Sequence, residues 1–223
     1  MNSLAVTHGP VRVPISKALQ ETRIIAILRA TDASRAEAVV HTLIENGVRC
    51  LELTMTTAGA LDVIRRLASQ LPDDIDLGMG TVLNADHVDL ASNAGARFVV
   101  SPDVSTEVIK AANSVGLASY PGALTPTEIV TAWNAGASAV KLFPGGALGI
   151  EYLRALRAPL PDIPLIPTGA VDVENVDAWL RAGASAVGLG GSLIGDAMTP
   201  NGDLTALARR TRSVCAAVSE LTT

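Results

Sequence analysis

The fold is decided by the stretch Ala135-Gly136-Ala137-Ser138-Ala139-Val140-Lys141-Leu142-Phe143-Pro144, where a small-residue turn runs directly into an apolar strand. Similar turns precede apolar strands at Asn46-Gly47-Val48-Arg49, Ala94-Gly95-Ala96-Arg97 and Ala182-Gly183-Ala184-Ser185. We expect each glycine to end a helix in the left-handed conformation. The four glycines are 48, 41 and 47 residues apart, so each interval has room for two strand-helix units.

Eight strands and eight helices fit this repeat. The strands are expected near 24–28, 49–54, 75–79, 97–101, 117–120, 138–143, 163–167 and 186–190. The helices are expected near 32–46, 57–69, 84–94, 104–115, 125–135, 150–157, 172–182 and 203–220. Helix caps are expected at Asp32, Asn84, Ser105 and Thr125, with Pro126 in a first helical turn. The alternation predicts an α/β fold, a (β/α)8 TIM barrel; a doubly wound sheet, the alternative, gives no reason for eight similar units.

The chain is expected to form a single domain over residues 1–223. Residues 1–23 would be an N-terminal segment with a short extra helix near 14–21 that covers the bottom of the barrel. Residues 24–200 would form the barrel core and residues 201–223 a C-terminal helix. Hydrophobic residues make up 48% of the chain and charged residues 17%, which excludes a disordered protein.

Composition also narrows the partners and the compartment. The net charge is −5 and no basic run is present, so nucleic acid is not expected as a partner. No window approaches 18 apolar residues without a charge, and residues 1–23 lack the apolar core of a signal peptide, so we expect neither a membrane span nor secretion. Cys50 and Cys215 are typical of small core residues in a reducing cytoplasm.

Lys141 and Glu52 are charged residues inside apolar strands. A buried lysine tends to lose its proton, and a neutral lysine is a nucleophile that forms a Schiff base with a carbonyl. A buried carboxyl such as Glu52 suits proton transfer. The alternatives are that the Lys141 side chain extends from the strand end to solvent, and that the two residues form a structural ion pair.

Glycine turns follow the last two expected strands. Backbone N–H groups in such turns approach an anion closely, and phosphate commonly binds at these places in barrels. The turns Thr168-Gly169-Ala170 and Gly190-Gly191-Ser192 therefore predict a phosphate site.

The histidines give no sign of a metal site. His8, His41 and His87 share no metal-binding spacing, and none of them ends a strand. We therefore expect no metal and disfavour a metal-dependent aldolase.

The chain resembles the 2-keto-3-deoxy-6-phosphogluconate (KDPG) aldolases, which are also 4-hydroxy-2-oxoglutarate aldolases. The pieces that carry the resemblance run in order from about residue 20 to 195. They are Ala26-Ile27-Leu28-Arg29-Ala30, Leu51-Glu52-Leu53-Thr54, Gly80-Thr81-Val82-Leu83-Asn84, Ser101-Pro102, Pro121-Gly122, Thr125-Pro126-Thr127-Glu128, Lys141-Leu142-Phe143-Pro144, Pro167-Thr168-Gly169 and Gly190-Gly191-Ser192.

This resemblance implies a class I aldolase, a lyase of the Entner–Doudoroff pathway. It would cleave KDPG reversibly to pyruvate and D-glyceraldehyde 3-phosphate, and also 4-hydroxy-2-oxoglutarate to pyruvate and glyoxylate. Lys141 would be the Schiff-base lysine and Glu52 the general acid–base, without a cofactor. Thr81, Pro102 and Phe143 match positions that line the family's pyruvate pocket, and the two glycine turns match its phosphate site. The family is typically trimeric, so a homotrimer is expected.

The chain departs from the family pattern at two places. Thr56 stands where many members have an arginine that holds the substrate carboxylate. Other members carry an arginine at the end of strand 1, as Arg29 does here, so we predict that Arg29 binds the pyruvate carboxylate; the alternative is a surface arginine. Ala170 replaces the more usual second glycine of the first phosphate turn and restricts its dihedral angles.

Other functions remain open on the sequence. The segment from Phe143 to Leu156 also looks like the aldolases that cleave 2-keto-3-deoxy-6-phosphogalactonate, the C4 epimer. A phosphosugar epimerase or isomerase would use Glu52 as its base and Lys141 as an electrostatic partner. A non-catalytic phosphate-ligand-binding barrel would keep the two residues as a structural pair.

Overall fold

The computed structural model of the protein describes residues 10–221, so His8 and the outermost residues of both terminal segments lie outside it. Strands and helices alternate along the chain. The strands are β1 (Ile24–Leu28), β2 (Cys50–Thr54), β3 (Asp76–Gly80), β4 (Phe98–Val100), β5 (Ala118–Tyr120), β6 (Gly122–Ala123), β7 (Val140–Leu142), β8 (Leu165–Pro167) and β9 (Val187–Leu189). The helices are α1 (Lys17–Thr22), α2 (Ala36–Glu45), α3 (Ala60–Ala68), α4 (Ala85–Asn93), α5 (Thr106–Ser114), α6 (Pro126–Ala135), α7 (Gly145–Arg157), the 3-10 turn η1 (Val173–Asn175), α8 (Val176–Arg181), α9 (Gly191–Ile194) and α10 (Leu204–Ser219).

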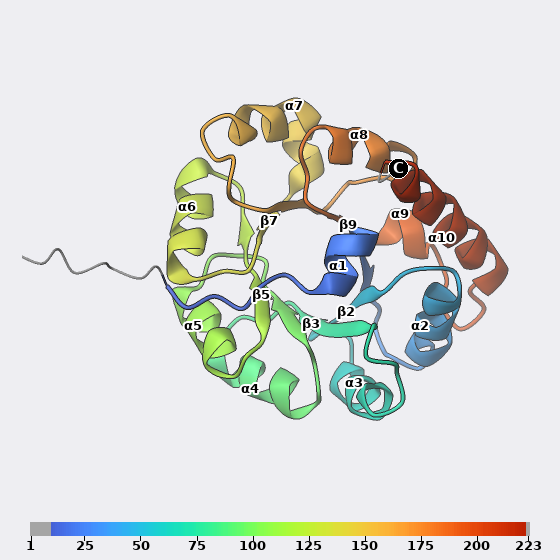
Figure 1. Ribbon diagram of the computed structural model, residues 1–223. Helices are drawn as coiled ribbons and strands as arrows, with labels where there is room; N and C mark the ends of the chain where they lie inside the picture. Colours follow the sequence, from blue (N-terminus) through green and yellow to red (C-terminus); the bar gives the residue numbers. More distant parts are fainter. Residues whose placement is uncertain (1–9, 222–223) are drawn as a thin grey trace, which may run out of the picture.

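The strands pair in parallel in two sheets, with the order β5-β4-β3-β2-β1-β9 in one and β6-β7-β8 in the other. The helices surround the strands, as Figure 1 shows. The strand expected over 117–120 is β5, and the two-residue β6, which was not predicted, follows it after Pro121, which has no N–H to continue the ladder. A single bridge between Thr168 and Gly188 joins the second sheet to β9. The fold is TIM-barrel-like, but it lacks the one continuous eight-stranded ladder that the sequence predicts.

Helix ends follow the sequence signals with one exception. Side chains of Asn84, Ser105 and Thr125 cap α4, α5 and α6, as predicted. The predicted cap at Asp32 is wrong, because its carboxylate accepts from the N–H of Ser34 at 2.9 Å and α2 begins only at Ala36. The four glycines of the repeat all have positive φ angles, between 91° and 108°.

Three helical regions differ from the prediction. α7 begins at Gly145, five residues before the expected start, and is broken at Gly149, whose φ is 73°. The single helix expected over 172–182 is divided into η1 and α8. α9, one short turn after β9, was not predicted at all. All these differences lie after β7 in the chain.

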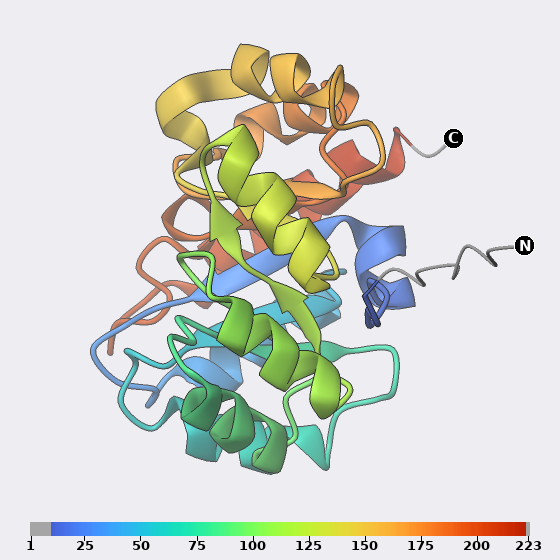
Figure 2. The same ribbon diagram turned by 90° about the vertical axis from the view of Figure 1, so that its left-hand side faces the viewer.

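Two hydrophobic clusters hold the fold together. The larger lies between the strands and the helices, and the smaller fills the inside of the barrel. Leu19 of α1 belongs to the inner cluster and is only 1% exposed, so the predicted N-terminal helix does cover the barrel bottom. Figure 2 shows α1 at one end of the barrel and α4, α5 and α6 side by side on its wall.

Candidate active site

Strand alternation places two charged side chains inside the barrel. Cys50 of β2 and Ala139, just before β7, lie in the inner cluster, and the residues that follow them pack in the outer one. Because side chains alternate along a strand, Glu52 and Lys141 also point inward. They are 1% and 6% exposed. This burial contradicts the alternative in which the Lys141 side chain extends to solvent.

Gly80 makes room for the carboxylate of Glu52. β2 pairs with β3, and Glu52 lies opposite Gly78 in the register. Gly80 follows two residues later on the same strand and so faces the same side of the sheet. A Cβ atom at position 80 would overlap the carboxyl group of Glu52. Only glycine therefore leaves the carboxylate in this place.

Burial shifts the pKa of both groups away from its ordinary value, and the neighbouring charges modify each shift. Burial lowers the pKa of Lys141; the negative charge of Glu52 opposes this shift and the positive charge of Arg29 adds to it. Burial raises the pKa of Glu52, opposed by the charges of Lys141 and Arg29. No hydrogen bond or ion pair joins Glu52 to Lys141 within the described part of the chain. A lysine with a lowered pKa and a carboxyl with a raised pKa are suited to nucleophilic and acid–base roles.

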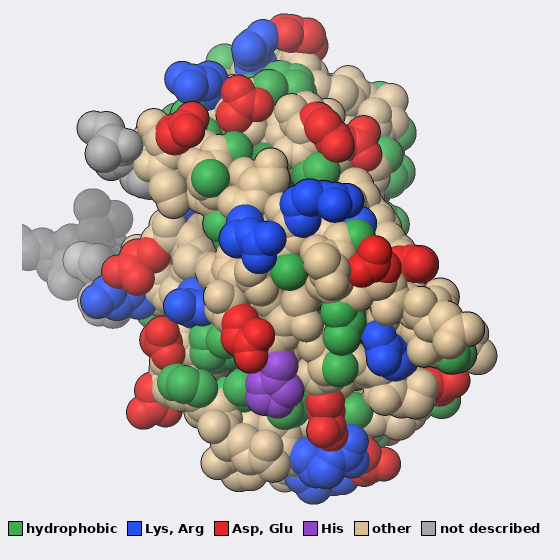
Figure 3. All heavy atoms as spheres, turned by 90° about the vertical axis from the view of Figure 1, so that its right-hand side faces the viewer, with side chains coloured by type: hydrophobic (Ala, Val, Ile, Leu, Met, Phe, Trp, Pro, Cys, Tyr) green, Lys and Arg blue, Asp and Glu red, His purple; other side chains and the backbone are tan. Residues whose placement is uncertain are grey.

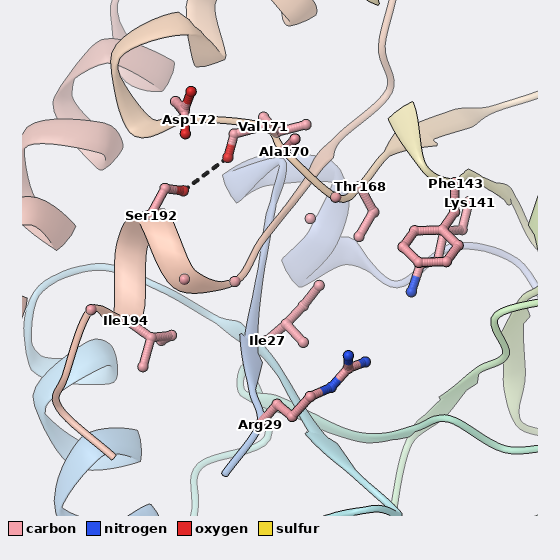
Figure 4. Close-up of a pocket in the computed structure, with 15 residues that line it drawn as sticks. Ile27, Arg29, Lys141, Phe143, Thr168, Ala170, Val171, Asp172, Ser192 and Ile194 are labelled. Carbon is pink, nitrogen blue, oxygen red and sulfur yellow. Dashed lines mark hydrogen bonds between the residues drawn. The ribbon is translucent and has the colours of Figure 1, made fainter. Parts of the chain in front are cut away.

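Two cavities meet at Lys141. The larger, of about 410 Å³, is lined by Lys141, Arg29, Phe143 and the two glycine turns, as Figure 4 shows. The smaller, of about 10 Å³, has Glu52 and Lys141 in its wall together with Tyr120 and Thr168. Its size is close to the least that holds a single water molecule. Glu52 and Lys141 therefore share the smaller cavity, and a ligand would approach Lys141 through the larger one.

Arg29 faces the lysine end of the larger cavity. It is exposed and follows β1, and Figure 4 shows its guanidinium directed into the space in front of Lys141. The ring of Phe143 lies on the other side, with its centroid 4.7 Å from Nζ of Lys141. A small anionic ligand bound to Lys141 would thus have a cation within the same cavity.

The far end of this cavity is built from the two glycine turns. All six predicted phosphate residues line it, namely Thr168, Gly169, Ala170, Gly190, Gly191 and Ser192. Ala170 has a φ of 55°, a left-handed conformation that glycine would adopt more easily. The Ser192 hydroxyl donates to the carbonyl of Val171 at 2.8 Å. The six predicted residues therefore lie together in one wall of the cavity, and phosphate binding by them stays a prediction.

Three predicted pocket residues line neither cavity. Thr56 is exposed, with its Oγ1 3.0 Å from Oγ1 of Thr54. Thr81 follows β3 with a φ of 58°, and Pro102 follows β4 with its carbonyl against Gly122. They lie at the correct end of the barrel, but their side chains do not reach the space in front of Lys141.

Sequence reasoning missed six residues of the cavity wall, namely Ile27, Val171, Asp172, Gly188, Ile194 and Gly195. Ile27 and Gly188 could have been found from strand alternation, since Ile27 precedes Arg29 by two residues and Gly188 lies within an apolar strand. Asp172 follows the first glycine turn by two residues, in a loop without periodicity. Only its position just after a predicted phosphate-binding turn could have indicated that Asp172 lines the cavity.

Neither metal clusters nor membrane helices are found within residues 10–221. No three His, Cys, Asp or Glu side chains of this range are grouped to hold a metal ion. No helix in the same range is long and apolar enough to cross a bilayer. On the face that carries α2 and α10, basic and acidic side chains are interspersed, as Figure 3 shows. That face therefore presents no extended patch of one charge.

Comparison with known proteins identifies the family of this chain. A sequence model described as KDPG and KHG aldolase matches residues 15–209, where KHG is 4-hydroxy-2-oxoglutarate. The chain belongs to this aldolase family. It is 37% identical over 171 residues to the 2-dehydro-3-deoxy-6-phosphogalactonate aldolase of Escherichia coli K12, which covers 76% of this chain and 83% of that protein.

Other relatives of the family match over shorter segments. A probable 2-dehydro-3-deoxy-6-phosphogalactonate aldolase of Rhizobium meliloti is 36% identical over 132 residues, or 59% of this chain and 61% of the relative. A 2-dehydro-3-deoxy-phosphogluconate aldolase of Pseudoalteromonas atlantica is 35% identical over 120 residues, or 54% of this chain and 55% of the relative. The chain thus spans less than two thirds of these two relatives. The relatives include proteins named for the galactonate substrate and proteins named for the gluconate substrate. All of them are named aldolases, which are lyases.

Solved structures of the family share the fold. A structure described as native KDPGal superposes with a TM-score of 0.83 at 32% identity, over 89% of this chain and 95% of that one. A 4-hydroxy-2-oxoglutarate/2-dehydro-3-deoxyphosphogluconate aldolase from TTHB1 superposes with a TM-score of 0.79 at 32% identity, over 90% of this chain and 96% of that one.

Proposed function

We propose that the protein is a class I aldolase that cleaves KDPG reversibly to pyruvate and D-glyceraldehyde 3-phosphate. The observation that carries the proposal is Lys141, a buried lysine with a lowered pKa that faces a cavity and has Glu52 behind it. A structural lysine gains nothing from this cavity, whereas a Schiff-base lysine needs both burial and access.

In the proposed reaction, the neutral amine of Lys141 attacks the C2 ketone of the sugar acid, and loss of water gives an iminium ion. Glu52 removes the proton of the C4 hydroxyl, directly or through a water in the small cavity. The C3–C4 bond breaks, its electrons move into the iminium to form an enamine, and the aldehyde leaves. The enamine is then protonated at C3 and hydrolysed, which releases pyruvate and the free amine. The iminium formed on Lys141 is the electron sink, so the proposal needs neither a metal nor a cofactor.

Arg29 would bind the pyruvate carboxylate in this scheme. Its guanidinium shares the cavity with Lys141, and its charge acts on the pKa of both Lys141 and Glu52. The backbone N–H groups of the glycine turns would orient the phosphate end, and such remote contacts position the reacting bond. Phe143 would pack against the substrate beside Lys141, while Thr81, Pro102 and Thr56 would contribute only if their loops moved.

The C4 epimer, 2-keto-3-deoxy-6-phosphogalactonate, is the second candidate substrate. It is favoured by the Escherichia coli relative, whose alignment covers more of this chain than those of the gluconate-named relatives above. Cleavage of 4-hydroxy-2-oxoglutarate to pyruvate and glyoxylate would use the same lysine and the same carboxyl. Purified protein assayed with both epimers and with this shorter acid would rank the three.

We also propose that the protein acts in the cytoplasm and forms a homotrimer. Within each subunit, the two sheets would form one closed (β/α)8 barrel. The free thiols of Cys50 and Cys215 suit a reducing compartment. Leu83 and Leu90 are 51% and 46% exposed beside α4, and apolar surface of this kind suits a contact between subunits. Analytical ultracentrifugation would give the oligomeric state directly.

The test of the aldolase is borohydride reduction in the presence of pyruvate. The chain has three lysines, Lys17, Lys110 and Lys141, so intact mass followed by peptide mapping assigns an adduct without ambiguity. We expect one reduced pyruvate adduct on Lys141, absent from Lys141→Met and retained by the exposed-lysine control Lys110→Met. A folded wild-type protein that forms no adduct at saturating pyruvate would refute the proposal.

A further inference from the structure

The far end of the large cavity carries a negative charge that no part of the proposed reaction uses. Asp172 lines this end, and Figure 4 shows it next to Ser192, away from Lys141 and Arg29. Among the described residues that line the cavity, Arg29 and Lys141 are the only cationic side chains, and both lie at the other end. The place expected to bind a phosphate therefore has a carboxylate and no cation.

The hydroxyl groups of the two glycine turns are already engaged as donors. The hydroxyl of Ser192 donates to the carbonyl of Val171 at 2.8 Å, and that of Thr168 to the carbonyl of Ile166 at 3.2 Å. Neither can donate to a phosphate without giving up its present bond.

The first turn of α7 is engaged in the same way. The N–H groups of Gly145 and Gly146 donate to the carbonyls of Thr168 and Gly169, each at 2.8 Å. A phosphate would thus depend on the backbone N–H groups of the two glycine turns, with the charge of Asp172 acting against it.

We propose that Asp172 determines specificity at this end of the cavity by lowering the advantage of phosphate-bearing substrates. The enzyme would then also accept 2-keto-3-deoxy sugar acids that end in a free hydroxyl, because a hydroxyl can donate a hydrogen bond to the carboxylate whereas a phosphate dianion is repelled by it. This inference rests on the proposed aldolase function and narrows its substrate class.

The first test is a titration of inorganic phosphate, which needs no turnover. Isothermal titration calorimetry would compare the wild type with Asp172→Asn, which removes the charge but keeps the shape and the capping ability of the side chain. Glu174→Gln is the matched control, because Glu174 is exposed in the same turn and does not line the cavity. We expect Asp172→Asn to bind phosphate about fivefold to tenfold more tightly at low salt, and the gain to shrink as salt is added. The control should match the wild type.

The second test is the ratio of kcat/KM for a phosphorylated sugar acid to that for its unphosphorylated counterpart. Asp172→Asn should raise this ratio through the KM of the phosphorylated substrate, with kcat nearly unchanged. Equal phosphate affinity in wild type and Asp172→Asn, or no measurable phosphate binding by either, would overturn the inference. A missing pyruvate adduct on Lys141 would instead defeat the aldolase proposal, while the phosphate titration would still decide the role of Asp172.

Discussion

The two ends of the cavity are built by different means. At the inner end, Glu52 and Lys141 come from the middle of strands, and their direction is set by alternation and by packing on all sides. At the far end, the wall is loop backbone from the turns after β8 and β9. In the proposed aldolase, the inner end would carry out the chemistry, where small displacements are costly, and the far end would select the substrate.

Glu52→Gln gives the largest expected effect among changes that keep Lys141. The amide cannot accept the C4 proton, so we expect kcat for cleavage to fall by about 10²- to 10⁴-fold. Pyruvate should still form its imine, measured by borohydride trapping, because that step needs Lys141. If imine formation and cleavage were lost to the same extent, Glu52 would have a structural role and not an acid–base role.

Arg29→Ala tests whether the cation at the lysine end of the cavity binds the substrate carboxylate. Loss of a charge-assisted bond to the pyruvate carboxylate should raise the concentration of pyruvate needed for half-maximal trapping by about 10- to 100-fold. Arg12→Ala is not a suitable control because Arg12 anchors the N-terminal segment to α6. Arg154→Ala, an exposed change on α7, is the better one. An unchanged Michaelis constant in Arg29→Ala would leave this residue as an ordinary surface arginine.

Lys141→Met should change how stability depends on pH. The pKa of Lys141 lies below its ordinary value of 10.5, so between that lowered pKa and 10.5 the unfolded chain binds more protons than the folded one. The free energy of unfolding contributed by this site therefore rises with pH, by at most about 1.4 kcal/mol per pH unit.

Urea unfolding of wild type and Lys141→Met at several pH values would measure this contribution. The wild type should gain stability relative to the variant as the pH is raised toward 10.5, and Lys110→Met should keep the wild-type slope. Parallel plots of the free energy of unfolding against pH for wild type and Lys141→Met would show that burial does not lower the pKa of Lys141.

Ala170→Gly should give the smallest effect, and it should be favourable. Ala170 has a φ of 55°, and removing its Cβ relieves the left-handed strain, so we expect the free energy of unfolding to rise by up to about 1 kcal/mol. Ala158→Gly, at a right-handed position with φ of −62°, should lower it by about 0.5–1 kcal/mol. Thermal unfolding of the pair gives both signs in one experiment, and a destabilised Ala170→Gly would contradict a strained far end.

The sequence predicted the directions of side chains within strands better than those of side chains at strand ends and in loops, for a physical reason. Alternation in an apolar strand fixes where Lys141 and Glu52 point, so their burial could be read from their neighbours. Strand ends carry less information, because a left-handed residue such as Thr81 ends the extended backbone on which alternation depends. Pro121 was seen, but not the break that its missing N–H makes between β5 and β6. Asp172 lies in a loop, where no period assigns a direction.

Gly80 has no functional group, yet it occupies the space next to the one carboxyl on which the proposed proton transfer depends. A glycine codon becomes an alanine codon by a single base change, and the added methyl would compete with Glu52 for that space. A random library screened for loss of aldolase activity should therefore yield Gly80 variants together with Lys141 variants. The Gly80 variants would retain their lysine and a native-like fold, and would be inactive through geometry alone.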